Sequence, residues 1–208
     1  MVKILGISSS PRKAGTDYAV KKALEGAADI GEVETKYISL RGKTIHPCIH
    51  CEKCMRTNTC VYDDDAQEII QAMFEADGII IGSPVYDMNY NAQLACLFNR
   101  FRSRSHDLHQ DIRPFGSKVG GAIAVGGSRN GGQEITVSGI LNFFLSQGMV
   151  VMGGEKWENA GSYVFSNDHK RWDENRDPEA IRSAFNLGNR IACLSRIIHE
   201  NPTDIILK

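Results

Sequence analysis

Short apolar runs rich in β-branched residues alternate with longer amphipathic stretches along most of this 208-residue chain. Apolar runs of this kind are typical of strands in a parallel sheet, because such strands are buried on both faces. The amphipathic stretches between them supply the crossover connections that parallel strands require. We expect strands at residues 2–7, 33–38, 78–82, 119–125 and 149–152, and helices at residues 18–28, 66–76, 92–102, 134–145 and 178–199.

This alternation predicts an α/β fold with a doubly wound, five-stranded parallel sheet. The pattern leaves two strand orders open, the flavodoxin-like order and the dinucleotide-binding order. No linker rich in Pro, Gly or Ser divides the chain, so we expect one domain over residues 1–208, with an irregular cysteine-rich segment, 41–65, inserted after the second strand. A second irregular segment, 155–177, carries four aromatic residues and indicates a ligand lid, a subunit contact or a self-packed surface loop.

The charge balance and the apolar runs exclude several classes of protein. The chain has 24 Lys and Arg against 25 Asp and Glu, a formal net charge of −1, so no electrostatic attraction to nucleic acid or an anionic membrane is expected. The apolar runs are far shorter than the roughly 20 residues of a membrane-spanning helix. The N-terminus carries no recognisable export signal, and we therefore expect a cytoplasmic protein in a reducing compartment.

The loop after the first strand, SSSPRKAGT at residues 8–16, leads directly into a helix. Anions bind at such a place because unpaired backbone N–H groups and the helix dipole converge there. The loop has neither glycine-rich nucleotide motif, but Ser8, Ser10 and Thr16 offer hydroxyls and Arg12 a charged donor, which suits the terminal monophosphate of FMN. In the alternative interpretation, Thr16 only caps the helix and the serines form a turn.

Two further loops follow the third and fourth strands, at residues 82–89 and 126–134. The carboxyl ends of parallel strands share one edge of a sheet, so all three loops are expected to meet at one crevice. Pro84 and Tyr86 can pack against a flavin ring there, and the glycines allow backbone N–H groups to approach its polar edge. The alternative is that these are ordinary glycine turns.

Four of the six cysteines lie within thirteen residues, in the pattern CxxCxxCxxxxxC. In a reducing compartment such a group indicates metal ligands or redox thiols, since disulfides do not persist there. The compact spacing favours one [4Fe–4S] cluster; zinc sites more often use two separated CxxC pairs, and redox thiols without metal are the remaining alternative. The predicted ligands are Cys48, Cys51, Cys54 and Cys60, whereas Cys96 and Cys193 are expected in the core.

Two charged segments follow the cysteine motif along the chain. Asp63 to Asp65 precede a helix and are expected to cap it and to match the charge of its N-terminus. A basic stretch follows further along the chain, and it indicates attraction of an acidic electron donor or of the additional phosphate of NADPH, or else a solvated face. Its members are Arg100, Arg102, Arg104, His106, His109 and Arg113.

The combined motifs resemble the iron–sulfur flavoproteins of anaerobic archaea and bacteria, within the flavodoxin-like NAD(P)H-dependent FMN reductases. The resemblance rests on SSSPRKAGT, on CxxCxxCxxxxxC ahead of DDD, and on GSPVYDMNYNAQL and VGGSRNGGQE, and it covers residues 2–194. It implies a homodimer or homotetramer whose subunits each hold FMN and one [4Fe–4S] cluster. It also implies electron input from ferredoxin.

The resemblance further implies a role for individual residues. The phosphate of FMN falls to Ser8, Ser10, Arg12 and Thr16, and the ribityl chain and ring fall to Pro84, Val85, Tyr86, Met88, Asn89 and Gly127. The implied activity is an oxidoreductase that passes single electrons through the cluster to FMN and on to an acceptor such as oxygen, peroxide or a quinone. Two alternatives remain: an NAD(P)H-dependent FMN or quinone reductase with a structural or zinc-bound cysteine segment, and a carrier that exchanges electrons only with proteins.

Overall fold

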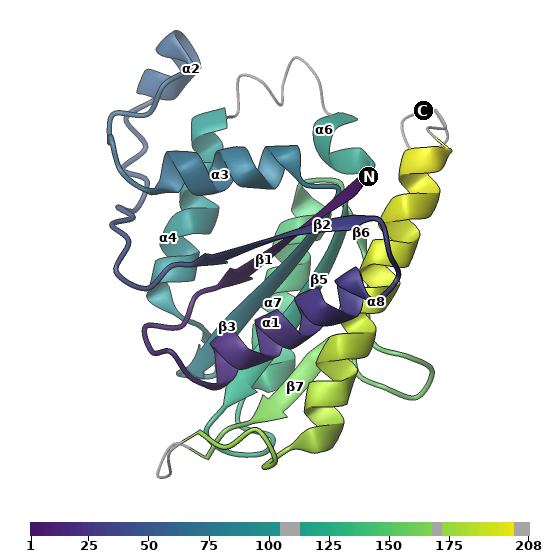
Figure 1. Ribbon diagram of the computed structural model, residues 1–208. Helices are drawn as coiled ribbons and strands as arrows, with labels where there is room; N and C mark the ends of the chain where they lie inside the picture. Colours follow the sequence, from purple (N-terminus) through teal and green to yellow (C-terminus); the bar gives the residue numbers. More distant parts are fainter. Residues whose placement is uncertain (105–112, 168–171, 202–208) are drawn as a thin grey trace.

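The computed structural model describes residues 1–104, 113–167 and 172–201, and it consists of a twisted sheet between two layers of helices (Figure 1). The described residues form a seven-stranded sheet, in which five parallel strands follow one path in the order β2-β1-β3-β5-β6. They are β1 (Val2–Ser8), β2 (Val33–Ser39), β3 (Gly78–Tyr86), β5 (Val119–Gly126) and β6 (Val150–Val151). Every residue of β5 is buried, as the continuous apolar pattern predicts for a strand covered on both faces.

The strand order settles which of the two predicted topologies is correct. After β1 the chain adds β2 on one side and then returns to add β3 on the other side. This is the flavodoxin-like order, so the predicted fold class is confirmed and the dinucleotide-binding order is excluded. The direction of winding reverses between β1 and β3, and ligands of open α/β sheets bind at such a point.

The fifth position of the sheet is filled by two short strands. β6 pairs with the beginning of β5, and β7 (Ser162–Phe165) pairs with its end, from Ile123 to Gly126. The whole segment 155–177 is predicted to be irregular, and that prediction is wrong for β7. Its alternating burial explains the difference: Ser162 and Val164 are buried while Tyr163 and Phe165 are half-buried, a pattern too short to stand out from a loop.

Helices cover both faces of the sheet. α1 (Gly15–Ala28) and α8 (Pro178–Glu200) lie on one face, and α3 (Ala66–Glu75), α4 (Ala92–Arg100) and α7 (Gln133–Ser146) lie on the other. The shorter elements are α2 (Lys53–Thr57), the 3₁₀ helix η1 (Phe101–Arg104), α6 (Arg113–Gly116) and β4 (Asn89–Tyr90), which pairs with β3 in an antiparallel hairpin. No helix of the described residues is long and apolar enough to cross a membrane.

The helix expected at 92–102 ends at Arg100 and continues as η1. The tighter 3₁₀ turn changes the direction of the next side chains. Phe101 is thereby buried in an aromatic cluster, with its ring centroid 5.2 Å from that of Phe115 and 5.3 Å from that of Phe143. Core packing therefore sets this helix end.

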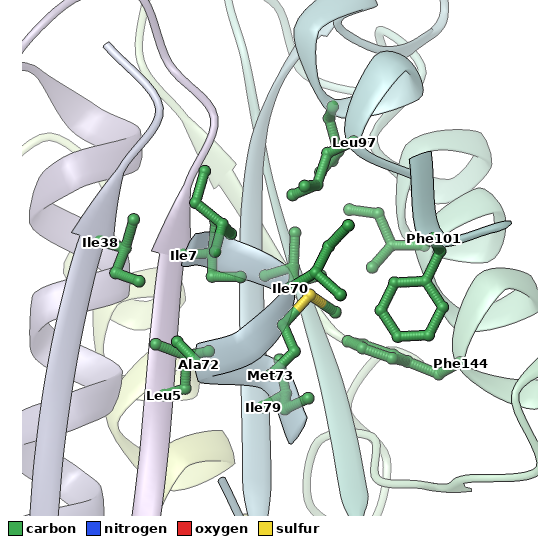
Figure 2. Packing of buried hydrophobic residues seen from close by; sticks show 14 of the residues in the cluster. Leu5, Ile7, Ile38, Ile70, Ala72, Met73, Ile79, Leu97, Phe101 and Phe144 are labelled. Atoms are coloured by element: carbon green, nitrogen blue, oxygen red, sulfur yellow. The ribbon is translucent and has the colours of Figure 1, made fainter. Parts of the chain in front are cut away.

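Two hydrophobic clusters, one on each face, hold the layers together. Figure 2 shows the cluster under α3, α4 and α7, where Leu5, Ile7 and Ile79 of the sheet meet Ile70 and Met73 of α3. On the other face α1 and α8 approach closely at glycine. A Cβ on Gly188 of α8 would overlap the carbonyl oxygen of Ala23 in α1.

Candidate functional site

A pocket, called here the strand-end pocket, lies at the carboxyl ends of β1, β3 and β5. Seven of the ten residues predicted for FMN line it: Ser10, Arg12, Thr16, Pro84, Val85, Tyr86 and Gly127. The three predicted loops therefore meet, as the shared sheet edge requires. Ser8, Met88 and Asn89 do not line the pocket.

The N-terminus of α1 reaches this pocket without a side-chain cap. Its N-cap residue is Ala14, and among the described residues no side chain accepts a hydrogen bond at the cap. Thr16 lies inside the first turn, so the interpretation of Thr16 as the helix cap is wrong. The first N–H groups of the helix lack a partner from a cap, and an anion is the ligand that such groups and the helix dipole favour.

The serines of the first loop differ in their surroundings. The Ser10 hydroxyl donates to the backbone oxygen of Arg12 at 2.9 Å and accepts from its N–H at 3.1 Å, which folds the loop. The hydroxyl of Ser9 is buried and makes no hydrogen bond within the described part of the chain. A buried hydroxyl without a partner costs stability unless a ligand supplies one, so this loop is suited to a polar ligand.

Behind the loop, Ser8 donates to the buried carboxylate of Asp17 at 2.6 Å. The guanidinium of Arg41 lies 3.6 Å from the other oxygen of that carboxylate. Burial of its phenol and the neighbouring Asp17 raise the pKa of Tyr37 to about 12. The hydroxyl of Ser8 binds Asp17 in the first turn of α1, and Ser8 does not line the pocket. Its predicted contact with the phosphate therefore stays a prediction.

Asn91 connects the first and second loops and was missed by the sequence analysis. Its side-chain amide donates to the backbone oxygen of Ser9 at 2.6 Å, and its own N–H donates to the Ser83 hydroxyl at 3.2 Å. Its side-chain oxygen accepts from Leu94 N at 3.3 Å and so caps α4. The available signal was an Asn directly before an amphipathic stretch, which is a common helix start.

The tip of the second loop is a two-residue turn. Asp87 and Met88 both have positive φ, 47° and 66°, as a type I′ hairpin requires. The backbone of Met88 packs on Gly132 of the third loop, where φ is 108° and a Cβ would lie 2.6 Å from the Met88 Cα. The side-chain oxygen of Asn89 accepts from Tyr90 N at 2.8 Å. Met88 and Asn89 thus shape the rim, and their predicted contacts with the ring stay predictions.

The third loop is shaped from within by Gln133. Its amide nitrogen donates to the Ser128 oxygen at 2.7 Å, and its amide oxygen accepts from Gly131 N at 2.8 Å. The buried Gln133 side chain therefore holds the backbone that leads away from Gly127 into a fixed curve.

Three further pocket residues, Ser166, Asn167 and Trp172, come from the chain that follows β7. The Trp172 ring packs against the backbone of Gly15 and lies 5.7 Å from the ring of Tyr18. The aromatic content of 155–177 indicated a ligand lid, a subunit contact or a self-packed loop, and it did not distinguish Trp172, which lines the pocket, from Trp157, which is 92% exposed.

A second pocket, called here the cysteine pocket, lies in the segment between β2 and α3. All four predicted ligands line it: Cys48, Cys51, Cys54 and Cys60. The backbone turns repeatedly here, with φ of 54° at His50, 58° at Glu52 and 53° at Asn58. The N–H of His50 donates to the Cys48 sulfur at 3.4 Å, a hydrogen bond of the kind that tunes thiolate ligands.

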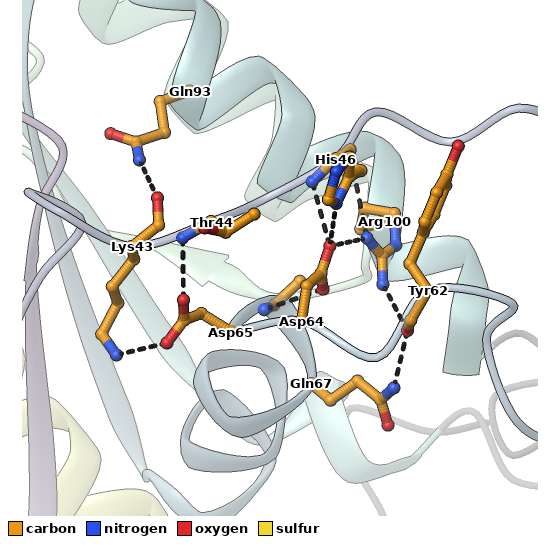
Figure 3. Close-up of polar contacts among 10 residues, drawn as sticks. Lys43, Thr44, His46, Tyr62, Asp64, Asp65, Gln67, Gln93 and Arg100 are labelled. Carbon is orange, nitrogen blue, oxygen red and sulfur yellow. Dashed lines mark hydrogen bonds and ion pairs between the residues drawn. The ribbon is translucent and has the colours of Figure 1, made fainter.

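The ends of the cysteine segment are joined to each other and to α4 (Figure 3). Asp65 accepts from Thr44 N at 2.7 Å and from the Lys43 ammonium at 2.9 Å. Gln93 of α4 donates to the backbone oxygens of Leu40 and Lys43, both at 2.9 Å. The segment is therefore a closed loop fixed to α4, whose N-cap residue Asn91 binds the loop after β1.

Asp64 serves both the helix and the loop. One of its oxygens accepts from Ala66 N at 3.2 Å, at the first residue of α3, whereas the N-cap residue Asp65 makes no side-chain cap hydrogen bond, so the expected capping by the aspartate run is met only by this contact of Asp64. The other accepts from His46 N at 3.0 Å and from Arg100 at 2.6 Å. Burial acts to raise the pKa of Asp64, but the bonds from Arg100 and His46 outweigh it and lower the pKa to about 2.

The basic stretch is not a uniform solvated face. Arg100 is 1% exposed and paired with Asp64, because core packing under α4 removes it from water and the carboxylate compensates its charge. Arg102 is exposed, and Arg104 lies 4.3 Å from the Phe74 ring centroid and donates to Gln71. His106 and His109 lie outside the described residues, as does the side chain of Arg113.

The donors of the cysteine pocket fit an iron–sulfur cluster. Four thiols surround one concave space, and Ile49, Met55 and Val61 give it apolar walls. Thiolate is the ligand that iron–sulfur clusters use, and a low-polarity shell controls solvent access to such a centre. Among the described residues, no three His, Cys, Asp or Glu side chains stand close enough to bind a single metal ion.

The sequence of residues 2–161 matches the family described as NADPH-dependent FMN reductase. An iron–sulfur flavoprotein of Methanocaldococcus jannaschii is 42% identical over 201 residues, which are 96% of this chain and 100% of that protein. Another, from Archaeoglobus fulgidus, is 37% identical over 190 residues, 91% of this chain and 95% of that protein.

Solved structures agree in fold. A WrbA-like flavodoxin from Agrobacterium tumefaciens superposes with a TM-score of 0.62 at 16% identity. The match covers 95% of this chain and 99% of the flavodoxin chain. The family match and the two sequence relatives establish the family, and the strand order and the two pockets described above agree with it. The chain belongs to the NADPH-dependent FMN reductase family and, within it, to the iron–sulfur flavoproteins.

Proposed function

We propose that this FMN-dependent oxidoreductase takes single electrons from a protein donor such as ferredoxin and delivers them to an acceptor such as oxygen, peroxide or a quinone. FMN and a [4Fe–4S] cluster supply the electron chemistry when bound. The observation that carries the proposal is that four cysteines line one pocket in a chain that also has a strand-end pocket with an uncapped helix N-terminus.

The strand-end pocket is assigned to FMN. The phosphate would be held at the start of α1 by Ser10, Arg12 and Thr16, with the backbone N–H groups of the first turn as further donors. The ring would lie against Pro84 to Tyr86 on one side of the pocket and meet Gly127 and Trp172 on others. No residue here is required as a general acid or base.

The cysteine pocket is assigned to the cluster, with Cys48, Cys51, Cys54 and Cys60 as its ligands. The apolar side chains around it are half-exposed: Ile49 is 58%, Met55 47% and Val61 45% exposed. Exposed apolar groups beside a redox site favour contact with a protein. This supports a protein electron donor and a homo-oligomer, dimer or tetramer, in which a second subunit covers part of this surface.

The test compares two cysteine variants after purification without oxygen. Cys51→Ala removes a proposed ligand, and we expect it to lose most iron and sulfide and all ferredoxin-linked flavin reduction while keeping one FMN per chain. Cys193→Ala, on α8 and outside the cysteine pocket, is the matched control and should keep both cofactors. Unchanged iron and sulfide in Cys51→Ala would exclude the assigned ligand set.

A second candidate function is direct reduction of FMN by NAD(P)H, with a structural or zinc-bound cysteine segment. The match to the NADPH-dependent FMN reductase family favours it. The expected signature is rapid bleaching of flavin absorbance by NADPH without oxygen, together with no iron on metal analysis. Iron and sulfide bound to the four cysteines, with no bleaching by NADPH, supports the single-electron function instead.

A further inference from the structure

Arg100, the last residue of α4, is one of the largest fully buried side chains of the described residues. It lines the cysteine pocket together with all four cysteines. A buried arginine is costly unless its charge is compensated, so its place beside four potential thiolates requires an explanation.

The hydrogen bonds of Arg100 leave part of its guanidinium without a partner. One terminal nitrogen donates to Asp64 at 2.6 Å and to the His46 oxygen at 3.1 Å, and the other lies 3.5 Å from the Tyr62 oxygen. The Nε–H is buried and has no hydrogen-bond partner within the described residues. A loop fixed only by an ion pair would need no such unsatisfied donor.

The ion pair between Arg100 and Asp64 has a defined orientation relative to the cysteine pocket. Arg100 lines the cysteine pocket, whereas Asp64, 2% exposed at its side chain, does not. The positive end of the pair therefore faces the sulfur ligands, and the carboxylate lies behind it.

We propose that Arg100, with Asp64 as its counter-charge, sets the reduction potential of the cluster held by the four cysteines. This inference rests on the proposed function. Each electron that the cluster accepts adds one negative charge, and a fixed cation in a low-dielectric surrounding stabilises the more negative state. Arg100 raises the potential, and Asp64 limits the rise by offsetting part of that charge.

The test measures the midpoint potential of the cluster in the holoprotein by titration with dithionite, followed by electron paramagnetic resonance. Dithionite supplies the electron and is itself oxidised. Arg100→Gln is expected to lower the midpoint potential by at least about 59 mV. For a one-electron couple, this shift lowers the ratio of reduced to oxidised cluster tenfold at a fixed solution potential. Asp64→Asn is expected to raise it, because it leaves the cation uncompensated.

Arg102→Gln is the matched control, since Arg102 lines the same pocket but is exposed. Its charge is screened by water and salt, so its shift should be less than a third of that of Arg100→Gln. Arg100→Lys keeps the charge and should keep the ratio within threefold of the parent protein. The proposal is overturned if Arg100→Gln and Arg102→Gln shift the midpoint potential equally. It is also overturned if Arg100→Gln and Asp64→Asn shift the midpoint potential in the same direction.

Iron, sulfide and FMN per chain are measured in every variant. If Arg100→Gln does not retain the cluster, Asp64→Asn decides: a higher potential supports the proposal, and an unchanged or lower one overturns it. If the parent protein binds no iron and sulfide, the proposed function fails and the inference falls with it. A parent protein with a full cluster and unmoved potentials in the variants refutes the inference alone.

Discussion

The indole of Trp172 rests directly on the backbone of Gly15, so that a Cβ at residue 15 would come within 2.8 Å of the ring. Gly15 is the first residue of α1, and the two residues join segments more than 150 positions apart in sequence where α1 reaches the strand-end pocket. Trp172 therefore reports directly on what occupies this pocket.

Tryptophan fluorescence should separate the two indoles of this chain. In Trp157→Phe the emission comes from Trp172 alone, and FMN added to the flavin-free protein should quench most of it because the ring lines the pocket. In Trp172→Phe the emission comes from Trp157, which is 92% exposed, and quenching should be slight. Equal quenching in both variants would show that FMN binds elsewhere.

Thr16→Val should weaken FMN but not riboflavin. The valine keeps the shape of a buried residue and removes only the hydroxyl assigned to the phosphate. A hydrogen bond to a charged group contributes about 1.5–3 kcal/mol, so we expect roughly a tenfold to hundredfold loss of FMN affinity in calorimetric titration. Thr136→Val, a buried threonine of α7, is the control and should bind both flavins as the parent protein does. A parallel loss for riboflavin would point to distortion of the pocket.

Gly188→Ala should destabilise the contact between α1 and α8. The added methyl overlaps the Ala23 carbonyl oxygen, a backbone atom that cannot turn away. Overpacking of this kind costs about 3 kcal/mol, which urea unfolding should show as a lower midpoint with an unchanged slope. Arg182→Ala, on an exposed position of the same helix, should change stability by less than about 0.5 kcal/mol.

Because of Tyr37, the free energy of unfolding should decrease as the pH rises above 10. Its pKa rises from 10 to about 12 in the folded protein, through burial and the neighbouring Asp17. A raised folded-state pKa contributes stability that is present below pH 10 and is lost as the pH rises through about 12. The full shift would correspond to about 3 kcal/mol, and solvent screening of the half-buried phenol reduces the expected loss to about 2 kcal/mol. Tyr37→Phe should lack this component in unfolding measured at each pH. A tyrosine signal in carbon NMR that titrates at pH 10 for residue 37 would refute the assignment.

The strands could be predicted because each carries its own signal. Three of the predicted strands, β1, β3 and β5, are nearly continuous apolar runs that identify buried parallel strands, and the loops at their carboxyl ends follow from that arrangement. β2 and β6 lie at the edges of the sheet, and most of their residues are half-buried or exposed. The residue pattern alone left the strand order open, since the order depends on which side of β1 receives β3; the flavodoxin-like order came from the family resemblance, and it is confirmed. β7 escaped notice because a four-residue strand with alternating burial has the same composition as a loop.

Long-range contacts account for the site residues that sequence alone did not reveal. Arg100 belongs to a run of basic residues, and nothing local distinguishes it from a solvated arginine. Its burial depends on Asp64, which lies 36 positions earlier in the chain. Asn91, by contrast, carried a local helix-start signal, although its bond to Ser9 spans 82 positions.

α4 acts as a spacer of fixed length between the two pockets. Asn91 at its beginning holds the loop after β1, and Arg100 at its end lines the cysteine pocket. Nine helical residues span about 14 Å, and each added residue would advance the end by about 1.5 Å and rotate it by about 100°. One insertion would therefore turn Arg100 away from the cysteines while leaving Asn91 in place, so the length of this helix, beyond its composition, is part of the specification of both sites.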